Sequence, residues 1–358
     1  MKKSLVALAV LAAAGAASAQ SSVTLFGIVD ATLAQGSGSV ANKTQLTNSG
    51  YNGSRLGFRG VEDLGGGLKG GFWLEAGVNN DNGSFGTSST NNQATGATGG
   101  GGMTFNRRST VSVGGGFGEV RLGRDYTPHF WTQTVYDPFG TNGVGTTQTL
   151  NSSTAGTTTV RASNSIAYLY NPGSFNGNSL IGSGLGLFVQ HYMGENASNA
   201  AGNTKNDGSG TSGRISYDQG PLSVALAMGQ TKFATGNITT TNIGGSYNLG
   251  AVKLAALYNQ DKVQNGANQT GYMLGANAPM GAGELRAALS TSKTNAAGSA
   301  KSNKFALGYV HNLSKRTAVY TTYARVTNSG GASQALNGAT TAANSNSSGF
   351  DLGLRHSF

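Results

Sequence analysis

The residues that could carry out catalysis are few in this chain and stand far apart. Its 358 residues contain no cysteine and only four histidines, at His129, His191, His311 and His356. No two of these histidines have the spacing of metal ligands, and no G-x-S-x-G element presents a nucleophilic serine. We therefore expect no metal site, no cofactor and no enzyme active site.

Two further motifs suggest chemistry but fit simpler structural interpretations. Glu62 and Asp63 are adjacent, and adjacent residues of a strand face opposite ways, so their carboxyl groups make poor acid–base partners. Gly65, Gly67 and Gly70 have the spacing of a dinucleotide-binding loop, but the following segment GGFWLEAGV alternates as a strand and no helix follows. The sequence predicts a tight hairpin turn there.

The elements that must position any functional side chain are segments in which apolar and polar residues alternate. The stretch VTLFGIVDATLA places Leu25, Val29 and Leu33 on one face, and Asp30 and Thr32 on the other. The stretches SRLGFRG, LKGGFWLEA, VKLAALY and NKFALGYVH repeat this pattern. A period of two predicts β-strands that are buried on one face only.

The connections between these segments alternate between short and long. Short turns such as DLGGG, GGGFG and NLSKR take turns with long loops rich in Gly, Asn, Ser and Thr, including residues 77–102 and 125–160. This layout is typical of an outer-membrane barrel with short periplasmic turns and long extracellular loops. The sequence therefore predicts an all-β, transmembrane antiparallel β-barrel of about 16 strands.

Composition and charge agree with a barrel and argue against other classes. Only 37% of the residues are hydrophobic and 58 are glycine, which suits a wall that is apolar on its outer face alone. The net charge is +10, but the basic residues are spread singly and form no basic run, so we expect no nucleic-acid partner.

The first residues predict export. Lys2 and Lys3 precede a short apolar run that ends in Ala17-Ser18-Ala19, as in a secretory signal peptide. We expect residues 1–19 to be cleaved and residues 20–358 to form the barrel domain in the bacterial outer membrane. Without Lys2 and Lys3, 22 basic residues stand against 14 acidic ones, a net charge of +8.

The last ten residues, GFDLGLRHSF, alternate to the end of the chain. Phe350, Leu352, Leu354 and Phe358 share one face, and Asp351 lies on the other. Because the last strand of a barrel must pair with the first to remove both sheet edges, this end has to be ordered. We expect Phe358 to lie in the periplasmic aromatic girdle and to serve barrel closure and assembly.

Several stretches together resemble the trimeric general porins of Gram-negative outer membranes, in particular the beta-proteobacterial branch. These stretches are SSVTLFGIVDATL, SRLGFRGVEDLGGGLKGGFWLE, FNRRSTVSVGGGFGEVRLGRDYTP, RASNSIAYLYNP and the terminal GLRHSF. The resemblance implies a homotrimer, with a third long loop folded into the lumen to form an eyelet. It also implies partners in outer-membrane lipid, lipopolysaccharide and the assembly machinery that receives the C-terminal strand.

The resemblance carries basic wall residues and a facing acidic loop onto particular positions. The matching wall positions are Arg55, Arg107, Arg124 and Arg161, and the matching loop carboxylate is Asp137 in DPFG. Two features depart from the family pattern. Arg108 follows Arg107, and strict alternation lets only one of the two face the lumen. From residue 126 to 160 the loop carries no charged residue besides Asp137.

The function implied is a passive diffusion channel for small hydrophilic solutes and ions, tuned by fixed charge in a narrow constriction. The lumen parity also includes Lys69, Arg121, Lys253, Arg286 and Lys304, so the sequence predicts modest anion selectivity. Three alternatives remain: a more specific anion or phosphate channel of the same fold, a barrel-type outer-membrane enzyme, and a structural or adhesive barrel with a plugged lumen.

Overall fold

The computed structural model describes residues 22–98, 102–151, 157–171, 174–177 and 182–358. The predicted signal peptide lies outside these residues. Within the described ranges, no helix is long and apolar enough to span a membrane.

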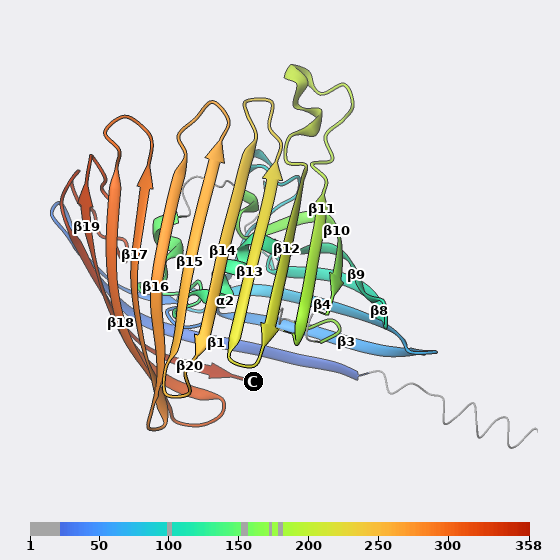
Figure 1. Cartoon of the computed structure of the whole chain (residues 1–358), viewed down its shortest axis with the longest axis horizontal. Coiled ribbons are helices and arrows are strands. Elements are labelled where there is room, and N and C mark those ends of the chain that lie inside the picture. Colours follow the sequence, from blue (N-terminus) through green and yellow to red (C-terminus); the bar gives the residue numbers. More distant parts are fainter. Residues whose placement is uncertain (1–21, 99–101, 152–156, 172–173, 178–181) are drawn as a thin grey trace, which may run out of the picture.

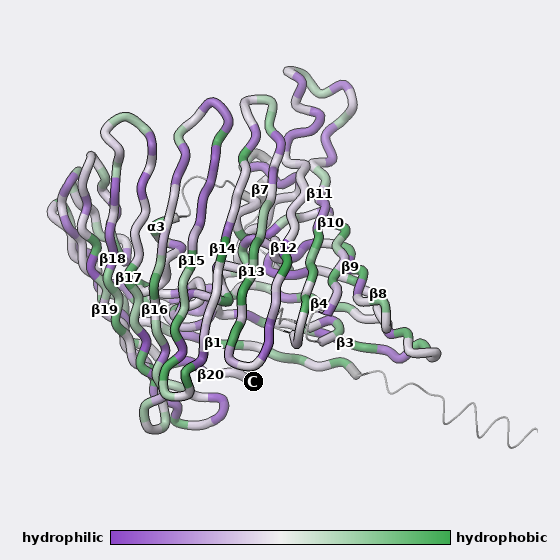
Figure 2. The backbone as a smooth tube through the Cα atoms, in the orientation of Figure 1, coloured by the Kyte–Doolittle hydropathy of each residue, from purple (hydrophilic) through white to green (hydrophobic). Residues whose placement is uncertain are grey.

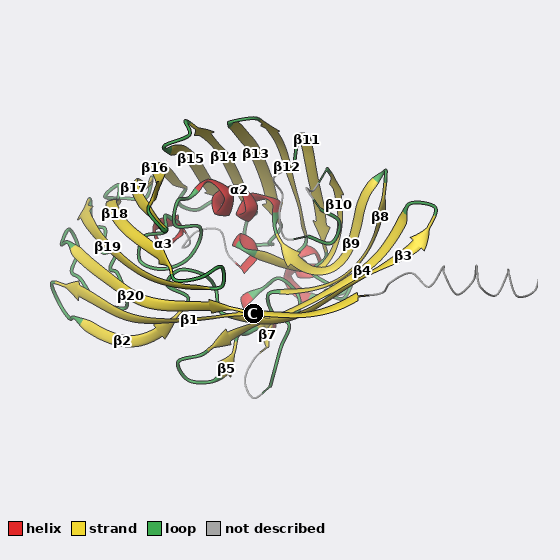
Figure 3. Cartoon of the chain, turned by 90° about the horizontal axis from the view of Figure 1, so that it is seen from below, coloured by secondary structure: helices red, strands yellow, loops and turns green. Residues whose placement is uncertain are grey.

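Sixteen of the described strands form one closed antiparallel barrel, as the sequence predicts (Figures 1 and 3). Each pairs with the next along the chain, and the last pairs with the first. The strands are β1 (Ser22–Gly38), β3 (Arg55–Gly65), β4 (Leu68–Asn79), β8 (Arg108–Gly115), β9 (Gly118–Tyr126), β10 (Arg161–Tyr170), β11 (Gly184–Tyr192), β12 (Gly210–Gln219), β13 (Leu222–Thr231), β14 (Ile238–Asn248), β15 (Lys253–Val263), β16 (Gln269–Met280), β17 (Gly283–Thr294), β18 (Lys301–Asn312), β19 (Thr317–Ser329) and β20 (Ser347–Ser357).

Shorter elements lie in the connections. They are β2 (Lys43–Asn48), β5 (Ser84–Phe85), β6 (Ser88–Ser89), β7 (Ala97–Thr98), α2 (Pro128–Tyr136), α3 (Gln148–Asn151), η1 (Ala94–Gly96), η2 (Thr157–Thr159) and η3 (Ala201–Asn206). The strand β2 continues the line of β3, because β1 pairs with β3 along its first half and with β2 along its second half. Residues 49–54 interrupt that line.

The two faces of the barrel wall differ as the alternation predicts. Along β13, Leu226 and Met228 are exposed on the outside, whereas Ala225 and Ala227 are buried on the inside. Figure 2 shows hydrophobic positions recurring along the middle of the strands and hydrophilic ones toward their loop ends. An outer apolar band with a polar interior is what a lipid-embedded barrel requires.

The prediction of short turns alternating with long loops holds for part of the chain. Short turns at 66–67 and 116–117 lie at one end, the turn side, and the long connections 80–107, 127–160 and 330–346 lie at the other, the loop side. The predicted alternation of short and long connections fails in other parts of the chain. Connections 232–237, 264–268 and 295–300 on the loop side are short, and connection 171–183 on the turn side is long.

The connection 127–160, the third loop, enters the barrel instead of extending outward. In Figure 3 the helix α2 lies inside the ring of strands. It packs against the inner faces of β11 to β15, and α3 packs against β16 and β17. The third loop therefore fills much of one side of the lumen, as the family resemblance implies.

Candidate pore constriction

The third loop is attached to the wall by polar side chains along α2. Pro128 begins the helix at a position where its missing N–H costs no helical hydrogen bond. His129 Nδ1 then lies 3.1 Å from Ser212 Oγ, Gln133 Nε2 donates to Asn259 at 2.7 Å, and Tyr136 lies 2.9 Å from Ser223 Oγ. Burial lowers the pKa of His129 to about 4, so this histidine is neutral at neutral pH.

Asp137 follows α2 and organises the turn that leads back along the loop. Its carboxylate accepts hydrogen bonds from the N–H of Phe139 at 2.9 Å and of Thr147 at 2.7 Å. Burial raises the pKa of Asp137, and these amides together with the Lys304 ammonium act in the opposite direction. The carboxylate is thus committed to the loop backbone, although the residue borders the lumen.

The tip of the third loop is also held by two charged residues of the wall. Asp351 accepts from the N–H of Val144 at 2.8 Å. Lys304 Nζ donates to the carbonyl oxygens of Val144, at 3.2 Å, and of Thr146. Lys304 is only 2% exposed, so this lumen-parity lysine lies beneath the loop and does not face a permeating ion.

Between the third loop and the opposite wall lies a cavity of about 600 Å³. Four arginines border it, namely Arg55, Arg107, Arg161 and Arg286. The loop side of the same cavity consists mainly of uncharged residues, from Phe130 to Asn142, with Asp137 among them. Three of the four predicted wall arginines, Arg55, Arg107 and Arg161, therefore border one cavity.

Arg55 and Arg107 share one carboxylate, that of Glu75 on β4. Arg107 Nε lies 2.5 Å from Glu75 Oε1, and Arg55 Nη1 lies 3.3 Å from the same oxygen. Trp73 Nε1 donates to the other oxygen at 3.0 Å. Glu75 is 1% exposed, whereas the two arginine side chains are 14% and 15% exposed. The two guanidinium groups are thus partly exposed to the lumen, whereas the Glu75 carboxylate that pairs with them is buried.

Tyr126 links Arg107 to Arg161. Its hydroxyl oxygen accepts from Arg107 at 2.6 Å and from Arg161 at 2.8 Å. The Arg161 guanidinium also lies 4.3 Å from the centre of the Tyr126 ring, a cation–π distance. Tyr126 in turn stacks on Phe130 of α2, with ring centres 5.0 Å apart. The arginines and the third loop are therefore joined through one aromatic residue.

Arg107 and Arg108 both point inward, although strict alternation allows only one of them. Arg108 is the first residue of β8 and has the inward parity, being 1% exposed. Arg107 precedes the strand, where alternation does not apply, and its side chain turns to Glu75. Arg124 is absent from the described cavity lining, and it donates to the Asn106 carbonyl at 2.6 Å and to Ser163 at 2.8 Å.

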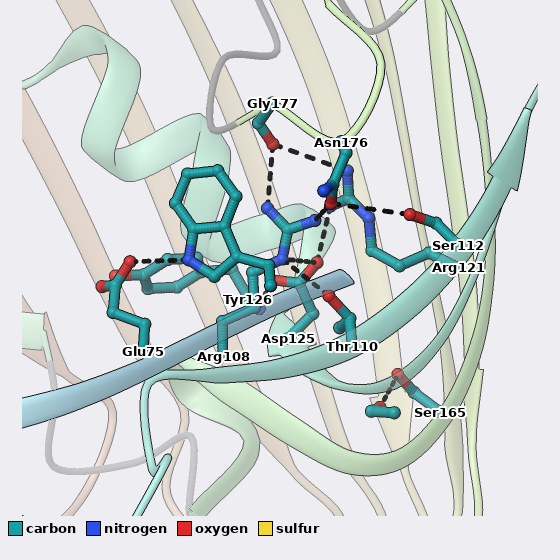
Figure 4. A network of polar contacts seen from close by, with 12 residues as sticks. Glu75, Arg108, Thr110, Ser112, Arg121, Asp125, Tyr126, Ser165, Asn176 and Gly177 are labelled. Atoms are coloured by element: carbon teal, nitrogen blue, oxygen red, sulfur yellow. Dashed lines mark hydrogen bonds and ion pairs between the residues drawn. The ribbon is translucent and has the colours of Figure 1, made fainter. Parts of the chain in front are cut away.

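A second polar network lies deeper in the wall, around Arg108 (Figure 4). Arg121 pairs with Asp125 at 2.6 Å and with Glu119 at 2.9 Å, and Arg108 lies 3.7 Å from Asp125. Arg108 also donates to Asn176 at 3.0 Å, from the turn-side connection 171–183. Arg121, counted by parity as a lumen charge, is thus neutralised within the wall.

Sequence reasoning missed several residues of the site. Alternation in LKGGFWLEA places Glu75 on the polar face of its strand but does not reveal that it is the shared counter-charge of Arg55 and Arg107. Tyr126 stands one residue before the third loop, and Tyr51 borders the cavity from the interruption at 49–54. The parity of Glu75 was a usable signal, whereas the contacts of Tyr51 and Tyr126 depend on how distant segments fold together.

Comparisons with known proteins agree with this architecture. A porin solved from Comamonas acidovorans, described as anion-selective, superposes with a TM-score of 0.79 at 36% identity, covering 95% of this chain and 100% of that one. The outer membrane protein OmpT of Vibrio cholerae, solved in a trimer form, superposes with a TM-score of 0.64 at 14% identity, covering 94% and 99%, and so shares the fold.

The sequence comparisons identify the family. Outer membrane porin protein 32 of Delftia acidovorans is 40% identical over the full length of both chains. An outer membrane porin of Bordetella pertussis is 30% identical, covering 89% of this chain and 93% of its own. Residues 4–331 match the Gram-negative porin family. The chain therefore belongs to the Gram-negative porins, which are channels of the bacterial outer membrane and not enzymes.

Proposed function

We propose that this porin passes small hydrophilic solutes and ions by passive diffusion, with a modest preference for anions. The observation that carries the preference is the set of three arginines, Arg55, Arg107 and Arg161, on one side of the cavity, with Glu75 as the carboxylate bonded to the first two. Three cations against one buried anion leave an excess of positive charge where the lumen is narrowed, and rings of fixed charge select ions.

The comparisons support the same proposal. The solved relative at 36% identity is described as anion-selective. The third loop adds little opposing charge, because Asp137 is the one charged residue from 126 to 160 and the Lys304 ammonium lies near its carboxylate. The site residues we assign to the constriction are accordingly Arg55, Arg107 and Arg161, with Arg124 supporting the wall behind them.

The test is the reversal potential of single channels in a salt gradient. We expect anion selectivity for the wild type, larger at low salt because ions screen the arginines less. Arg55→Ser combined with Arg161→Ser should move the reversal potential toward cations. Lys315→Ser, in the exposed turn 313–316, is the matched control and should change nothing. A cation-selective wild type, or an unchanged double variant, contradicts the proposal.

A more specific anion or phosphate channel is the second candidate. Arg107 and Arg161 converge on one oxygen, the Tyr126 hydroxyl, at 2.6 and 2.8 Å. Guanidinium forks suit the oxygens of phosphate, and both groups border the cavity, so a phosphate that enters the cavity would meet two cations held side by side. Chloride current that falls with micromolar phosphate would favour this candidate, whereas current unaffected by millimolar phosphate would favour general diffusion.

We propose a homotrimer that associates through the seam between β1 and β20. Leu25, Val29 and Leu33 of β1 are exposed on the outer face, at 55%, 43% and 49%. Small residues between them, such as Ala31, allow close approach of two membrane-embedded surfaces. We also propose that the C-terminal strand, ending at Phe358, is what the outer-membrane assembly machinery receives.

Outer-membrane lipid and lipopolysaccharide are proposed partners at the loop side. The outward-facing residues there include five exposed cations, at Lys232, Lys262, Lys293, Lys301 and Arg325. Lys293 and Lys301 lie directly opposite each other in the β17–β18 register, an unfavourable arrangement without a counter-anion. Among the described residues no ion pair neutralises them, and phosphate groups of outer-leaflet lipids would.

Lipopolysaccharide binding can be measured on purified trimers. Lys293→Gln with Lys301→Gln should weaken retention of phosphorylated lipid A, while the turn-side control Lys315→Gln should retain it. Equal retention of dephosphorylated lipid A by wild type and variant is also expected. Unchanged binding of phosphorylated lipid A by the double variant would contradict this partner assignment.

A further inference from the structure

The second long connection, residues 80–107, is bonded to β10 of its own barrel through one buried amide. Asn92 is 1% exposed. Its Oδ1 accepts from the N–H of Ser163 at 2.7 Å, and its Nδ2 donates to the carbonyl of the same residue at 3.2 Å. Nδ2 also donates to the carbonyl of Met193, just beyond β11, at 3.1 Å. The Asn92 side chain thus bonds both backbone groups of Ser163, as a neighbouring strand does in an antiparallel sheet.

The strand β10 carries a bulge at this point. Ser165 lies opposite Gly123 of β9, whereas Arg161 lies opposite Tyr126, so β10 has one residue more than β9 over this stretch. A bulge leaves its extra residue unpaired in the ladder and re-aims the side chains next to it. If β10 paired without the bulge, Ala162 would stand opposite Tyr126, and Arg161 would lie one residue beyond.

The strap, residues 89–92, bonds both residues of the bulge. The carbonyl of Ser89 accepts from Ser163 Oγ at 2.6 Å, and the carbonyl of Thr90 accepts from Asn164 Nδ2 at 2.7 Å. Asn164 has a φ of +56°, a left-handed conformation that a regular strand does not contain. The strap therefore supplies hydrogen bonds exactly where β9 does not.

The bulge in turn sets where Arg161 lies. Opposite Tyr126, Arg161 donates to the tyrosine hydroxyl at 2.8 Å, and its guanidinium lies 4.3 Å from the ring centre. The same register continues to the base of the third loop, where the N–H of Thr127 donates to the carbonyl of Val160 at 3.1 Å. Arg161 borders the cavity, and the described lining of that cavity does not include Asn92.

We propose that Asn92 is a positioning residue for Arg161: it holds the bulge of β10, and the second long connection thereby sets the ion selectivity of the constriction from outside the lumen. Loss of the Asn92 amide leaves the backbone groups of Ser163 without these partners and favours regular pairing, in which β9 supplies them. The register then moves by one residue and carries Arg161 away from Tyr126. This inference rests on the proposed anion preference of the channel.

The test is a double-variant cycle on the chloride-to-potassium permeability ratio, measured in planar bilayers with potassium chloride gradients. Arg161→Gln should lower the ratio by roughly twofold, since a partly exposed charge contributes modestly. Asn92→Ala removes no charge and should lower the ratio by a similar factor. The variant with both substitutions should match Arg161→Gln alone, because two residues that act through one contact are not additive. A merely structural Asn92 would affect stability and leave the ratio unchanged.

Gln93→Ala is the matched control in the same connection. Gln93 Nε2 donates to Asn196 Oδ1 at 3.1 Å and to the carbonyl of Asp207 at 3.2 Å, so this variant weakens the attachment to the β11–β12 connection and leaves the bonds to β10 in place. Its permeability ratio should equal that of the wild type.

A second pair of variants tests the bulge even where Asn92→Ala does not fold. Asn164→Val disfavours the positive φ and should lower the ratio as Asn92→Ala does, whereas Asn164→Gly permits that φ and should retain most of the wild-type ratio.

The outcomes separate this inference from the proposed function. A wild type that is not anion-selective contradicts the proposed function itself. An anion-selective wild type whose ratio Arg161→Gln lowers, but Asn92→Ala and Asn164→Val do not, overturns the positioning role. That role is also overturned if Arg161→Gln leaves the ratio unchanged, or if the effects of Asn92→Ala and Arg161→Gln add.

Discussion

At the scale of single residues, the constriction depends on where its few carboxylates lie. Glu75 and Asp137 both border or support the arginine group, but each has its oxygens occupied: Glu75 by Arg55, Arg107 and Trp73, and Asp137 by loop amides. A buried carboxylate whose oxygens are all bonded holds its partners in fixed positions. Because four arginines border the cavity, we expect them to dominate the field in the lumen.

His129 offers a pH test of how the third loop is docked. Burial lowers the pKa of His129 to about 4, below the value near 6.5 of an exposed histidine. Between these two values the unfolded chain binds a proton that the folded chain does not, so stability falls as pH drops through that window. The full loss is on the order of 3 kcal/mol.

The measurement is the urea midpoint of folded protein in detergent at pH 7.5 and pH 4.5. Wild type should lose more stability over this interval than His129→Gln, which cannot take up the proton. Asp137, whose pKa is raised, changes stability in the opposite direction in both proteins and cancels in the difference. Identical pH dependence in the two proteins would mean that His129 is not buried against Ser212 as described.

The sequence predicted the arginines better than their partners, for a physical reason. Arg55, Arg107 and Arg161 follow from motif positions at the starts of strands. The contacts of Tyr51 with Arg286 and Arg355 join residues more than 200 positions apart, and no local pattern specifies them. Arg107 could not be assigned from parity because it stands just outside β8.

At the scale of elements, the strands were predictable because alternation directly reflects a wall with one lipid face and one polar face. The lengths and shapes of the connections were not predictable, because they depend on tertiary contacts that no local sequence pattern encodes. The turn-side connection 171–183 illustrates this: Asn176 enters the barrel, donates to the carbonyls of Gly60 and Phe72, and accepts from Arg108. Its neighbour Phe175 packs over Gly71 and Gly114, where a Cβ would collide with it.

Asn176 should therefore stabilise the turn-side half of the barrel. Asn176→Ala leaves the buried Arg108 guanidinium without one acceptor and removes the side-chain donor from two wall carbonyls, so we expect a loss of about 1–3 kcal/mol. The Arg108 guanidinium lies 4.6 Å from the Trp73 ring, so tryptophan fluorescence during urea unfolding reports on this region. Ser174→Ala, at an exposed position of the same connection, is the control. Equal stability of the two variants would refute this role.

At the scale of the whole molecule, the pairing of β1 with β20 closes the barrel, and Phe358 lies at the end of that seam. Phe358 and Gly27 exchange both backbone hydrogen bonds at 3.1 Å, and the Phe358 ring covers the Gly27 backbone. The pairing of β20 with β1 removes the two edges that would otherwise remain open. The structure thus places Phe358 at the seam and on the outer face, where it is 45% exposed.

Deletion of Phe358 should lower the fraction of folded barrel in the outer membrane. The expected signature is loss of the band that shifts on heating in gel electrophoresis, because an unclosed barrel unfolds in detergent without heat. Phe358→Tyr keeps the ring and the backbone pairing, so it should assemble normally. Wild-type amounts of heat-modifiable protein after the deletion would show that closure does not need this residue.

The trimer interface can be separated from barrel folding by a substitution that lipid tolerates. Ala31 faces outward on β1 among exposed Leu25, Val29 and Leu33, whereas Ala256 faces outward on β15, on a part of the wall distant from the seam. Tryptophan is compatible with lipid at either position, but at Ala31 it would hold two barrels apart if they meet at the seam. We therefore expect Ala31→Trp to fold yet to lose most of the unheated species near three times the monomer mass. Ala256→Trp should keep that species, because its wall faces lipid in the proposed trimer.

Light scattering in mild detergent gives the stoichiometry of each variant. A full trimer from Ala31→Trp, or loss of the trimer from Ala256→Trp alone, would place the interface on another part of the barrel.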